Sequence, residues 1–195
     1  MAKVTNVLLV GVGGQGTLLA ARILSGVLQE AGHDVKMSEV HGMSQRGGSV
    51  VTFVRYGDKV HSPLVEKGRA DLILSFEKLE ALRWLPYLKP TGTIVVNDLA
   101  LLPAPVLMGK AEYPYNALDL LREKTGKLIT LDAARVAVEE AGNIRTQNVA
   151  LLGALAQNMD IGMETWRRVI KENVPPQTVE ANLKAFAAGG DASGL

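Results

Sequence analysis

The sequence predicts an α/β fold in which helices cover both faces of a mostly parallel sheet. Short apolar or β-branched segments, typical of strands, alternate along the chain with segments whose apolar residues recur at helical spacing. A glycine-rich loop joins the first strand to the first helix, which is how Rossmann-like folds begin. Only about eight residues separate the second and third strands, too few for a crossover helix, so we expect these two strands to pair antiparallel. The prediction is therefore a three-layer α/β/α sandwich with a mixed sheet.

The composition and the charge are those of one ordinary globular domain. The chain has 195 residues, of which 47% are hydrophobic and 21% are charged, and its formal net charge is +1. This length suits a single domain with a sizeable core, so we expect residues 1–195 to form one domain. The near-neutral charge predicts no nucleic-acid partner. Because the sequence has no long apolar run and no signal-peptide layout at its start, we expect a cytoplasmic protein without membrane contact.

The residues that usually hold metals are scarce. Cysteine is absent and histidine occurs only three times, as His33, His41 and His61. Without thiolates the chain cannot ligate an iron–sulfur cluster in the usual way, and three scattered histidines do not predict a metal cage. We therefore predict no metal site in this chain.

Six segments have the residues and the length of strands. The first is apolar and ends at a glycine, and the third, SVVTFVRY, is β-branched and aromatic. The last three, DLILSF, TIVVN and KLITL, are short apolar runs typical of buried parallel strands. In chain order, the predicted strands are Asn6–Val10, Val35–Val40, Ser49–Tyr56, Asp71–Phe76, Thr93–Asn97 and Lys127–Leu131.

Six helices are predicted from apolar spacing and from start and stop signals. Gly32 ends the first helix, Asp132 caps the third, and Pro175 and Pro176 precede the last. Three prolines make the segment Leu101–Tyr115 irregular, and the terminal GGDASGL should be frayed. In chain order, the predicted helices are Thr17–Ala31, Glu77–Leu88, Ala133–Ala141, Asn148–Met159, Glu164–Glu172 and about Gln177–Phe186.

The loop GVGGQG, between the first strand and the first helix, suits a phosphate. Gly11, Gly13 and Gly16 match the GxGxxG pattern, and glycine lets the backbone approach a ligand closely. The helix that follows offers free N–H groups and a favourable dipole. Glu39 ends the second strand, where dinucleotide folds place a ribose-binding carboxylate, but the short connection after it argues against an ordinary dinucleotide domain. A second interpretation is that the glycines only permit tight packing of strand and helix.

The loop HGMSQRGG, residues 41–48, is dense in hydrogen-bonding groups. Arg46 can bind a phosphate or carboxylate in a bidentate way, and Ser44 and Gln45 can orient a ligand or a partner's backbone. Since the first and second strands run the same way, this loop should lie at the same sheet edge as the glycine loop. The loop contains no carboxylate to tune His41, which favours binding or structure over proton transfer. The alternative is a long hairpin loop with solvated side chains.

Three segments together resemble a known family. GVGGQGTLLAARIL, HGMSQRGGSVVTFVRYG and ADLILSFEKLEAL are similar to the gamma-type subunits of 2-oxoacid:ferredoxin oxidoreductases, most of all to the smaller (beta) subunits of the indolepyruvate enzymes. The resemblance continues in NVALLGALA and VEANLKAFAAG and so covers nearly the whole chain. It implies the fold of domain III of pyruvate:ferredoxin oxidoreductase, which agrees with the mixed sheet predicted above.

The resemblance also implies a function. Enzymes of this family decarboxylate a 2-oxoacid, pass two electrons to ferredoxin and transfer the acyl group to coenzyme A. The resemblance implies that the 2-oxoacid here is an arylpyruvate such as indolepyruvate. Thiamine diphosphate and iron–sulfur clusters would belong to a larger partner subunit, which would also meet ferredoxin. This chain would hold no cofactor alone, would help to complete the active site and would contact coenzyme A.

The candidate binding residues lie on the two loops, and no catalytic residue is predicted. They are Gly11, Gly13, Gly14, Gln15, Gly16, Thr17, His41, Ser44, Gln45, Arg46, Gly47 and Gly48. Two other functions stay open. One is a stand-alone NAD- or FAD-dependent oxidoreductase, which the glycines and Glu39 favour. The other is a scaffold subunit that binds no nucleotide and uses its loops only to meet the partner.

The apolar C-terminal helices are expected to pack on the rest of the domain over residues 148–187. For Asn148–Met159 we expect burial against the sheet, because a helix that is apolar nearly all round is usually buried. The final helix, with Val179, Leu183 and Phe186, is one candidate for docking the larger subunit. Trp166 and the segment Pro103–Tyr115 are others, since aromatic residues are frequent in interfaces.

Overall fold

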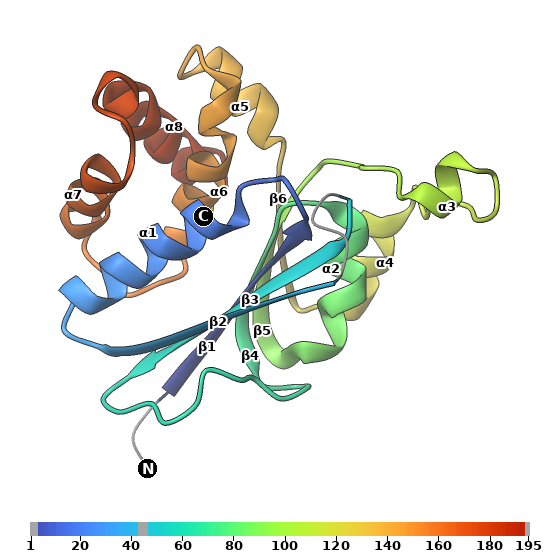
Figure 1. Cartoon of the computed structure of the whole chain (residues 1–195), viewed down its shortest axis with the longest axis horizontal. Coiled ribbons are helices and arrows are strands. Elements are labelled where there is room, and N and C mark those ends of the chain that lie inside the picture. The colour runs from blue at the N-terminus through green and yellow to red at the C-terminus, as the bar shows by residue number, and fades with distance from the viewer. Residues whose placement is uncertain (1–3, 43–46, 194–195) are drawn as a thin grey trace.

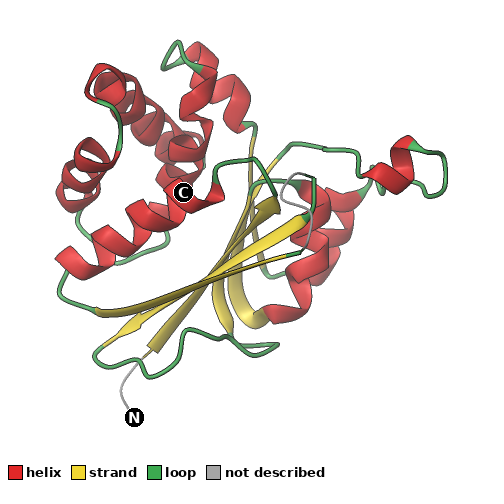
Figure 2. Ribbon diagram, in the orientation of Figure 1, coloured by secondary structure: helices red, strands yellow, loops and turns green. Residues whose placement is uncertain are grey.

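The computed structural model describes residues 4–42 and 47–193, and they form a sheet between two layers of helices. Figure 1 labels the elements and Figure 2 separates helices from strands by colour. The sheet has the strand order β2-β3-β1-β4-β5-β6. Its strands are β1 (Val4–Val12), β2 (Asp34–His41), β3 (Ser49–Gly57), β4 (Ala70–Ser75), β5 (Leu88–Asn97) and β6 (Lys127–Leu131).

The sheet is mixed, as predicted. β3 lies between β1 and β2 and pairs antiparallel with both, whereas β1, β4, β5 and β6 pair parallel with one another. The expected antiparallel pairing of the second and third strands is therefore confirmed. The fold class predicted from the sequence, an α/β sandwich with a mostly parallel sheet and a Rossmann-like start, is confirmed as well.

Two helical layers cover the two faces of the sheet (Figure 1). The alternation of side chains along β1 illustrates both layers: Val7 and Leu9 face one apolar core, and Leu8 and Val10 face the other. The larger core is shared with the first and the C-terminal helices, α1 (Thr17–Glu30), α5 (Ala133–Glu139), α6 (Gln147–Ala156), α7 (Met163–Asn173) and α8 (Val179–Ala192). The smaller core is shared with α2 (Lys78–Trp84) and α4 (Ala117–Lys124).

Several helix ends follow the local signals in the sequence. Gly32 has a φ of 87°, the left-handed conformation that ends a helix. The Asp132 side chain accepts a hydrogen bond from the backbone N–H of Arg135 at 2.9 Å and so caps α5. The predicted helix Glu77–Leu88 is too long, because Pro86 lacks an N–H and the chain turns into a 3₁₀ segment, Leu85–Tyr87.

The segment between β5 and β6 is more ordered than predicted. The short helix α3 (Ala104–Leu107) lies inside the proline-bearing stretch that we expected to be irregular, and α4 follows it without a sequence prediction. Residues 101–116, which we call the arm, project away from the sheet with α3 at their tip (Figure 1). Proline at the first turn of α3 is compatible with a helix because the first N–H groups have no partner inside the helix.

The last helix, α8, is longer than predicted: we expected it to end at about Phe186 and the residues after it to be frayed. α8 continues to Ala192, so residues 189–192 are helical and not frayed. Gly189 and Gly190 are buried because the backbones of α6 and α8 touch there: a Cβ at Gly189 would overlap the carbonyl oxygen of Ala150, and one at Gly153 would overlap that of Phe186. Gly153, Gly189 and Gly190 therefore serve close helix packing, although the composition of the tail predicted fraying at Gly189 and Gly190.

Trp166 and Phe186 are core residues, so the idea that they dock a partner is wrong. Trp166 is 0% exposed and Phe186 is 4% exposed, and their rings stack with centroids 5.6 Å apart. Val179 and Leu183 pack against the same core. By contrast, α6 is buried along its length, as its all-apolar sequence predicted.

None of the helices in residues 4–42 and 47–193 combines the length and the apolar character that a bilayer crossing requires.

The contact between α6 and α8 leads to a test of stability. Gly153→Ala should lower the free energy of unfolding by about 3 kcal/mol, because the added methyl group forces two backbones apart. Gly126→Ala is the matched control, since a Cβ there would lie 3.8 Å from the Pro90 carbonyl oxygen, an ordinary contact. Urea unfolding of both variants measures the difference. Equal stabilities would contradict the close approach of the two helices.

Candidate functional site

The glycine loop, residues 13–16, joins β1 to α1 and leaves the start of α1 open. Gly14 and Gly16 have φ values of 100° and 77°, which side chains rarely adopt, so both positions favour glycine. Among residues 4–42 and 47–193 no side chain caps α1, and its first turn has no acidic residue. In contrast, Glu77 caps α2 and Asp132 caps α5. The first N–H groups of α1 are thus available to an anion from outside the chain.

The side chain of Gln15 faces the protein and braces this loop. Its Oε1 accepts a hydrogen bond from the Val12 N–H at 2.7 Å, and its Nε2 donates to the Phe76 carbonyl oxygen at 3.0 Å. Gly11 lies under it, and a Cβ at Gly11 would come within 2.9 Å of Gln15 Oε1. Gln15 and Gly11, two of the predicted binding residues, therefore hold the loop in shape, and the second interpretation of the glycines, tight packing, applies to Gly11.

The two predicted loops meet at the same edge of the sheet. The Gly13 N–H donates to the Gly48 carbonyl oxygen at 2.8 Å, and the Gly47 N–H donates to the Gly13 carbonyl oxygen at 3.2 Å. The expectation that residues 41–48 lie beside the glycine loop is confirmed for these glycines. Ser44, Gln45 and Arg46 lie outside the described residues, so their predicted roles remain predictions.

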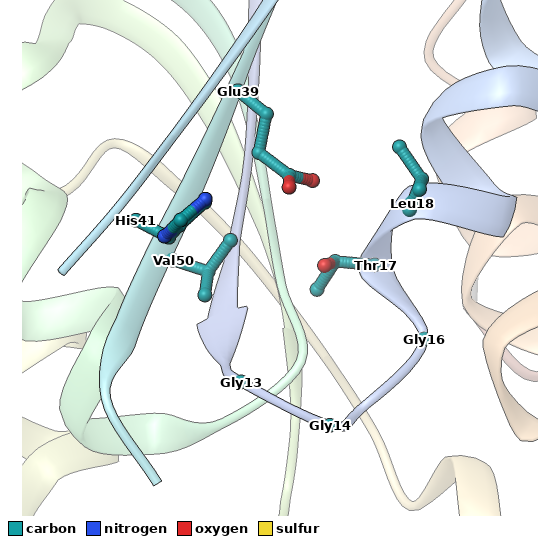
Figure 3. Close-up of a pocket in the computed structure, with 8 residues that line it drawn as sticks. All are labelled: Gly13, Gly14, Gly16, Thr17, Leu18, Glu39, His41 and Val50. Atoms are coloured by element: carbon teal, nitrogen blue, oxygen red, sulfur yellow. The ribbon is translucent and has the colours of Figure 1, made fainter. Parts of the chain in front are cut away.

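A cavity of about 290 Å³ opens between the glycine loop and β2. Figure 3 shows Glu39 and His41 on one side, facing Thr17 and Leu18 at the start of α1, with Val50 of β3 between them. Its lining residues are Gly13, Gly14, Gly16, Thr17, Leu18, Glu39, His41 and Val50. Five of the predicted binding residues, Gly13, Gly14, Gly16, Thr17 and His41, therefore surround one cavity.

Glu39 lines this cavity, although it was not among the binding residues predicted from the sequence. The signal was present, since Glu39 lies near the end of the second strand, where dinucleotide folds place a carboxylate. Its carboxylate accepts a hydrogen bond from the Thr52 hydroxyl at 3.3 Å. A carboxylate here can accept a hydrogen bond from a hydroxyl of a ligand, and it repels a phosphate placed against it.

A second and larger hollow lies on the other side of Gly13. It has a volume of about 610 Å³ and is lined by Gly13 and Gly47, by the start of α2, and by residues 101–107 of the arm. Most of the arm's contribution is apolar, from leucine, proline and alanine side chains. The hydrogen-bonded glycines Gly13 and Gly47 thus lie between two hollows.

Two buried carboxylates at the edge of the larger hollow are fully engaged with the protein. Glu80 is 4% exposed, accepts a hydrogen bond from the Ser49 hydroxyl and pairs with Arg83 Nε at 3.0 Å. Glu77 is 1% exposed and accepts hydrogen bonds from the Tyr113 hydroxyl and from the Leu101 N–H at 3.2 Å. These contacts tie the arm and the start of β3 to α2 and leave neither carboxylate as an obvious base.

Burial raises the pKa of Tyr113 above its ordinary value, and the hydrogen bond to the Glu77 carboxylate raises it further. A raised pKa in the folded state means that the stabilisation is complete below the pKa of the unfolded tyrosine and is lost as the pH rises above about 10. The root of the arm should therefore weaken in alkali.

Tyr113→Phe should lower the free energy of unfolding at pH 7 by about 2 kcal/mol, since Glu77 loses a hydrogen-bond donor. It should also make the decline of stability above about pH 10 shallower, because the titrating phenol is gone. Tyr115→Phe is the control, as its ring is 73% exposed. Urea unfolding between pH 7 and pH 11 measures both effects. The same slope in both variants would contradict the role of Tyr113.

Among residues 4–42 and 47–193 there is no cluster of three histidine, aspartate or glutamate side chains arranged to hold a metal ion.

Comparison with known proteins assigns the family. The sequence model described as pyruvate ferredoxin/flavodoxin oxidoreductase matches residues 6–192 of this chain. The chain belongs to this family. It is 45% identical over 194 residues to the indolepyruvate oxidoreductase subunit IorB of Pyrococcus horikoshii, which covers 96% of this chain and 95% of that protein.

Solved structures share the fold. The gamma subunit of a keto/oxoacid ferredoxin oxidoreductase from Geobacter sulfurreducens has a TM-score of 0.72 at 21% identity and covers 97% of this chain and 98% of its own. The 2-oxoglutarate:ferredoxin oxidoreductase of Magnetococcus marinus, solved with 2-oxoglutarate, coenzyme A and succinyl-CoA bound, also has a TM-score of 0.72, at 18% identity. That match covers 98% of this chain but 31% of the other. The family match and the curated relatives identify the chain as a subunit of a 2-oxoacid:ferredoxin oxidoreductase. The solved structures show that its fold also occurs inside a longer polypeptide.

Proposed function

We propose that the chain is the smaller subunit of an indolepyruvate or other arylpyruvate:ferredoxin oxidoreductase, that it contributes to the coenzyme A site, and that it is inactive alone. The relatives named indolepyruvate oxidoreductase subunits support the choice of substrate. The reaction would be oxidative decarboxylation of the 2-oxoacid, with the acyl group transferred to coenzyme A and two electrons passed to ferredoxin. This chain would help to close the active site.

The observation that carries the coenzyme A proposal is the uncapped start of α1 beside the cavity. Coenzyme A is rich in phosphate, and free N–H groups at a helix start next to glycines of positive φ are suited to phosphate. Glu39 and His41 face the same cavity (Figure 3), so the phosphates should lie toward the glycine loop and away from Glu39. Arg46 would add its guanidinium as an anion partner.

The remaining cofactors would belong to a larger partner subunit. The chain has no cysteine with which to hold an iron–sulfur cluster, which fits a division of labour between two chains. The larger subunit would carry thiamine diphosphate, where carbanion chemistry takes place, and the clusters that deliver electrons to ferredoxin. The present chain, folded as one gamma-type domain, would complete that assembly.

Titration with coenzyme A tests the binding proposal. Arg46→Ala should weaken binding at least tenfold, because a charge-assisted phosphate contact is lost. Glu39→Gln should leave binding unchanged or tighten it about twofold, because a repelling charge is removed. Isothermal calorimetry of the chain alone and of the assembled enzyme gives both constants. No binding by the assembled enzyme would contradict the proposal.

A stand-alone NAD- or FAD-dependent oxidoreductase is the second candidate, and the place of Glu39 in the cavity favours it. Against it, β3 lies between β1 and β2, whereas β1 and β2 are neighbours in an ordinary dinucleotide fold. NADH and FAD are therefore titrated beside coenzyme A. Tight binding of either, weakened by Glu39→Gln, would replace the coenzyme A proposal with this one.

The arm is the surface that we assign to the larger subunit. It exposes large apolar side chains that this chain cannot bury, with Leu107 at 69%, Met108 at 60% and Tyr115 at 73% exposure. At the root of the arm, the Tyr113 hydroxyl donates a hydrogen bond to the Glu77 carboxylate, which holds the arm in place against α2. Contiguous exposed apolar surface is typical of subunit interfaces.

Replacing both Leu107 and Met108 by serine should weaken assembly with the larger subunit at least tenfold, because two buried anchors are lost at the interface. The stability of the chain itself should change by no more than about 0.5 kcal/mol. Val138→Ser is the control, as this side chain on α5 is 53% exposed and lies far from the arm in sequence. Co-purification and analytical ultracentrifugation measure assembly. Unchanged assembly of the double variant would exclude the arm.

If the loops serve only to meet the partner, as in a scaffold that binds no nucleotide, then Arg46→Ala would weaken assembly, and the chain alone would not bind coenzyme A.

A further inference from the structure

The peptide between Gln15 and Gly16 is held by a residue far along the chain. Asn148, the second residue of α6, donates from Nδ2 to the Gln15 carbonyl oxygen at 2.6 Å. A carbonyl oxygen only accepts, so the NH₂ half of the Asn148 amide is the half that pairs with it. All residues of α6 from Val149 to Ala156 are buried. The position of Asn148 is therefore fixed by the packing of a core helix.

This hydrogen bond determines which way the next N–H points. No peptide bond among the described residues is cis, and a trans peptide directs its C=O and N–H to opposite sides. Because the Gln15 carbonyl is directed at α6, the Gly16 N–H is directed away from α6. Gly16 also lines the cavity beside the glycine loop. Asn148 thus orients a donor at the start of α1.

Asn148 also explains why position 16 is glycine. A Cβ at Gly16 would lie 3.0 Å from Asn148 Nδ2, tighter than an ordinary contact, and the φ of 77° is already unfavourable for a side chain. The hydrogen bond therefore adds a second reason for glycine at position 16.

The loop is braced from further sides by uncharged amides. The Gln15 side chain binds the Val12 N–H and the Phe76 carbonyl oxygen. Asn97 donates to the same Phe76 oxygen at 3.3 Å and accepts a hydrogen bond from the N–H of Ala133, the first residue of α5, at 3.0 Å. Gln15, Asn97 and Asn148, which we call the amide brace, connect the loop to both the sheet and the C-terminal helices. None of the three titrates.

We propose that Asn148 is a positioning residue that holds the glycine loop in its binding conformation before a ligand arrives. A loop that is ordered in advance loses less conformational entropy on binding and so binds more tightly. For the identity of the ligand, coenzyme A, the inference rests on the proposed function. The conformation of the loop itself is tested without any ligand.

Hydrogen exchange of the free chain is the first measurement. In Asn148→Ala and in the isosteric Asn148→Asp, which loses the donor, the Val12, Gln15 and Leu19 amides should exchange about five- to tenfold faster. Asn158→Ala is the matched control: Asn158 follows α6, and its Nδ2 also donates to a backbone carbonyl oxygen, that of Ala154, at 3.1 Å. It should leave those three amides unaffected. Unchanged loop exchange in both Asn148 variants would overturn the inference.

The second measurement uses the assembled enzyme. Both Asn148 variants should raise the KM for coenzyme A about five- to tenfold while kcat changes less than twofold, because the loop must be ordered again on binding. Equal effects of Asn158→Ala on this KM would overturn the inference, since a general loss of packing would then be the cause. Faster loop exchange together with a wild-type enzyme that does not bind coenzyme A would leave the positioning role standing and refute the proposed ligand.

Discussion

The insertion of β3 between β1 and β2 is the constraint on which the candidate site depends. Val50 of β3 pairs with Gly11 on one side and with His41 on the other, so the ends of β1 and β2 flank the same residue. The cavity therefore has Val50 between its two walls, the glycine loop and β2. Compared with a fold in which β1 and β2 are neighbours, Glu39 lies one strand spacing, about 4.8 Å, farther from the phosphate-binding loop. The same features that suggest a dinucleotide site in the sequence thus surround a different space in the protein.

Different side-chain groups brace the protein on the two sides of Gly13: amides beside the glycine loop and carboxylates beside the arm. On the side of the glycine loop, the bracing groups are amides, which keep their hydrogen bonds at any physiological pH. On the side of the arm, the bracing groups are the carboxylates of Glu77 and Glu80, each buried and each satisfied by hydroxyl or N–H donors. A buried carboxylate is stable only with such partners, because leaving it unpaired costs several kcal/mol. The arm is therefore exposed at its tip and firmly anchored at its root.

The C-terminal helices connect global packing to the loop. Gly153 and Gly189 allow α6 and α8 to approach until their backbones touch, and this approach contributes to the position of α6 against the sheet. Asn148 stands at the start of α6, and its amide reaches the Gln15 carbonyl oxygen only because the helix lies where it does. We therefore expect a change deep in the C-terminal layer to reach the start of α1 through Asn148. The C-terminal helices are thus joined to the glycine loop by a direct hydrogen bond.

By itself, the sequence determined the strands in their chain order, most of the helices, the antiparallel third strand, the position of the two loops at one sheet edge and the family. These follow from local spacing, from the length of one connection and from motifs whose residues are close along the chain. Only the tertiary structure decided that Gln15 braces the loop, that Glu39 faces the cavity, that Trp166 is core, and that Gly189 packs where composition indicates fraying. It also revealed the reach of Asn148 across 133 positions. Such contacts depend on how whole helices pack against the sheet. The spacing and the type of the residues along the chain do not show which of them the packing brings together.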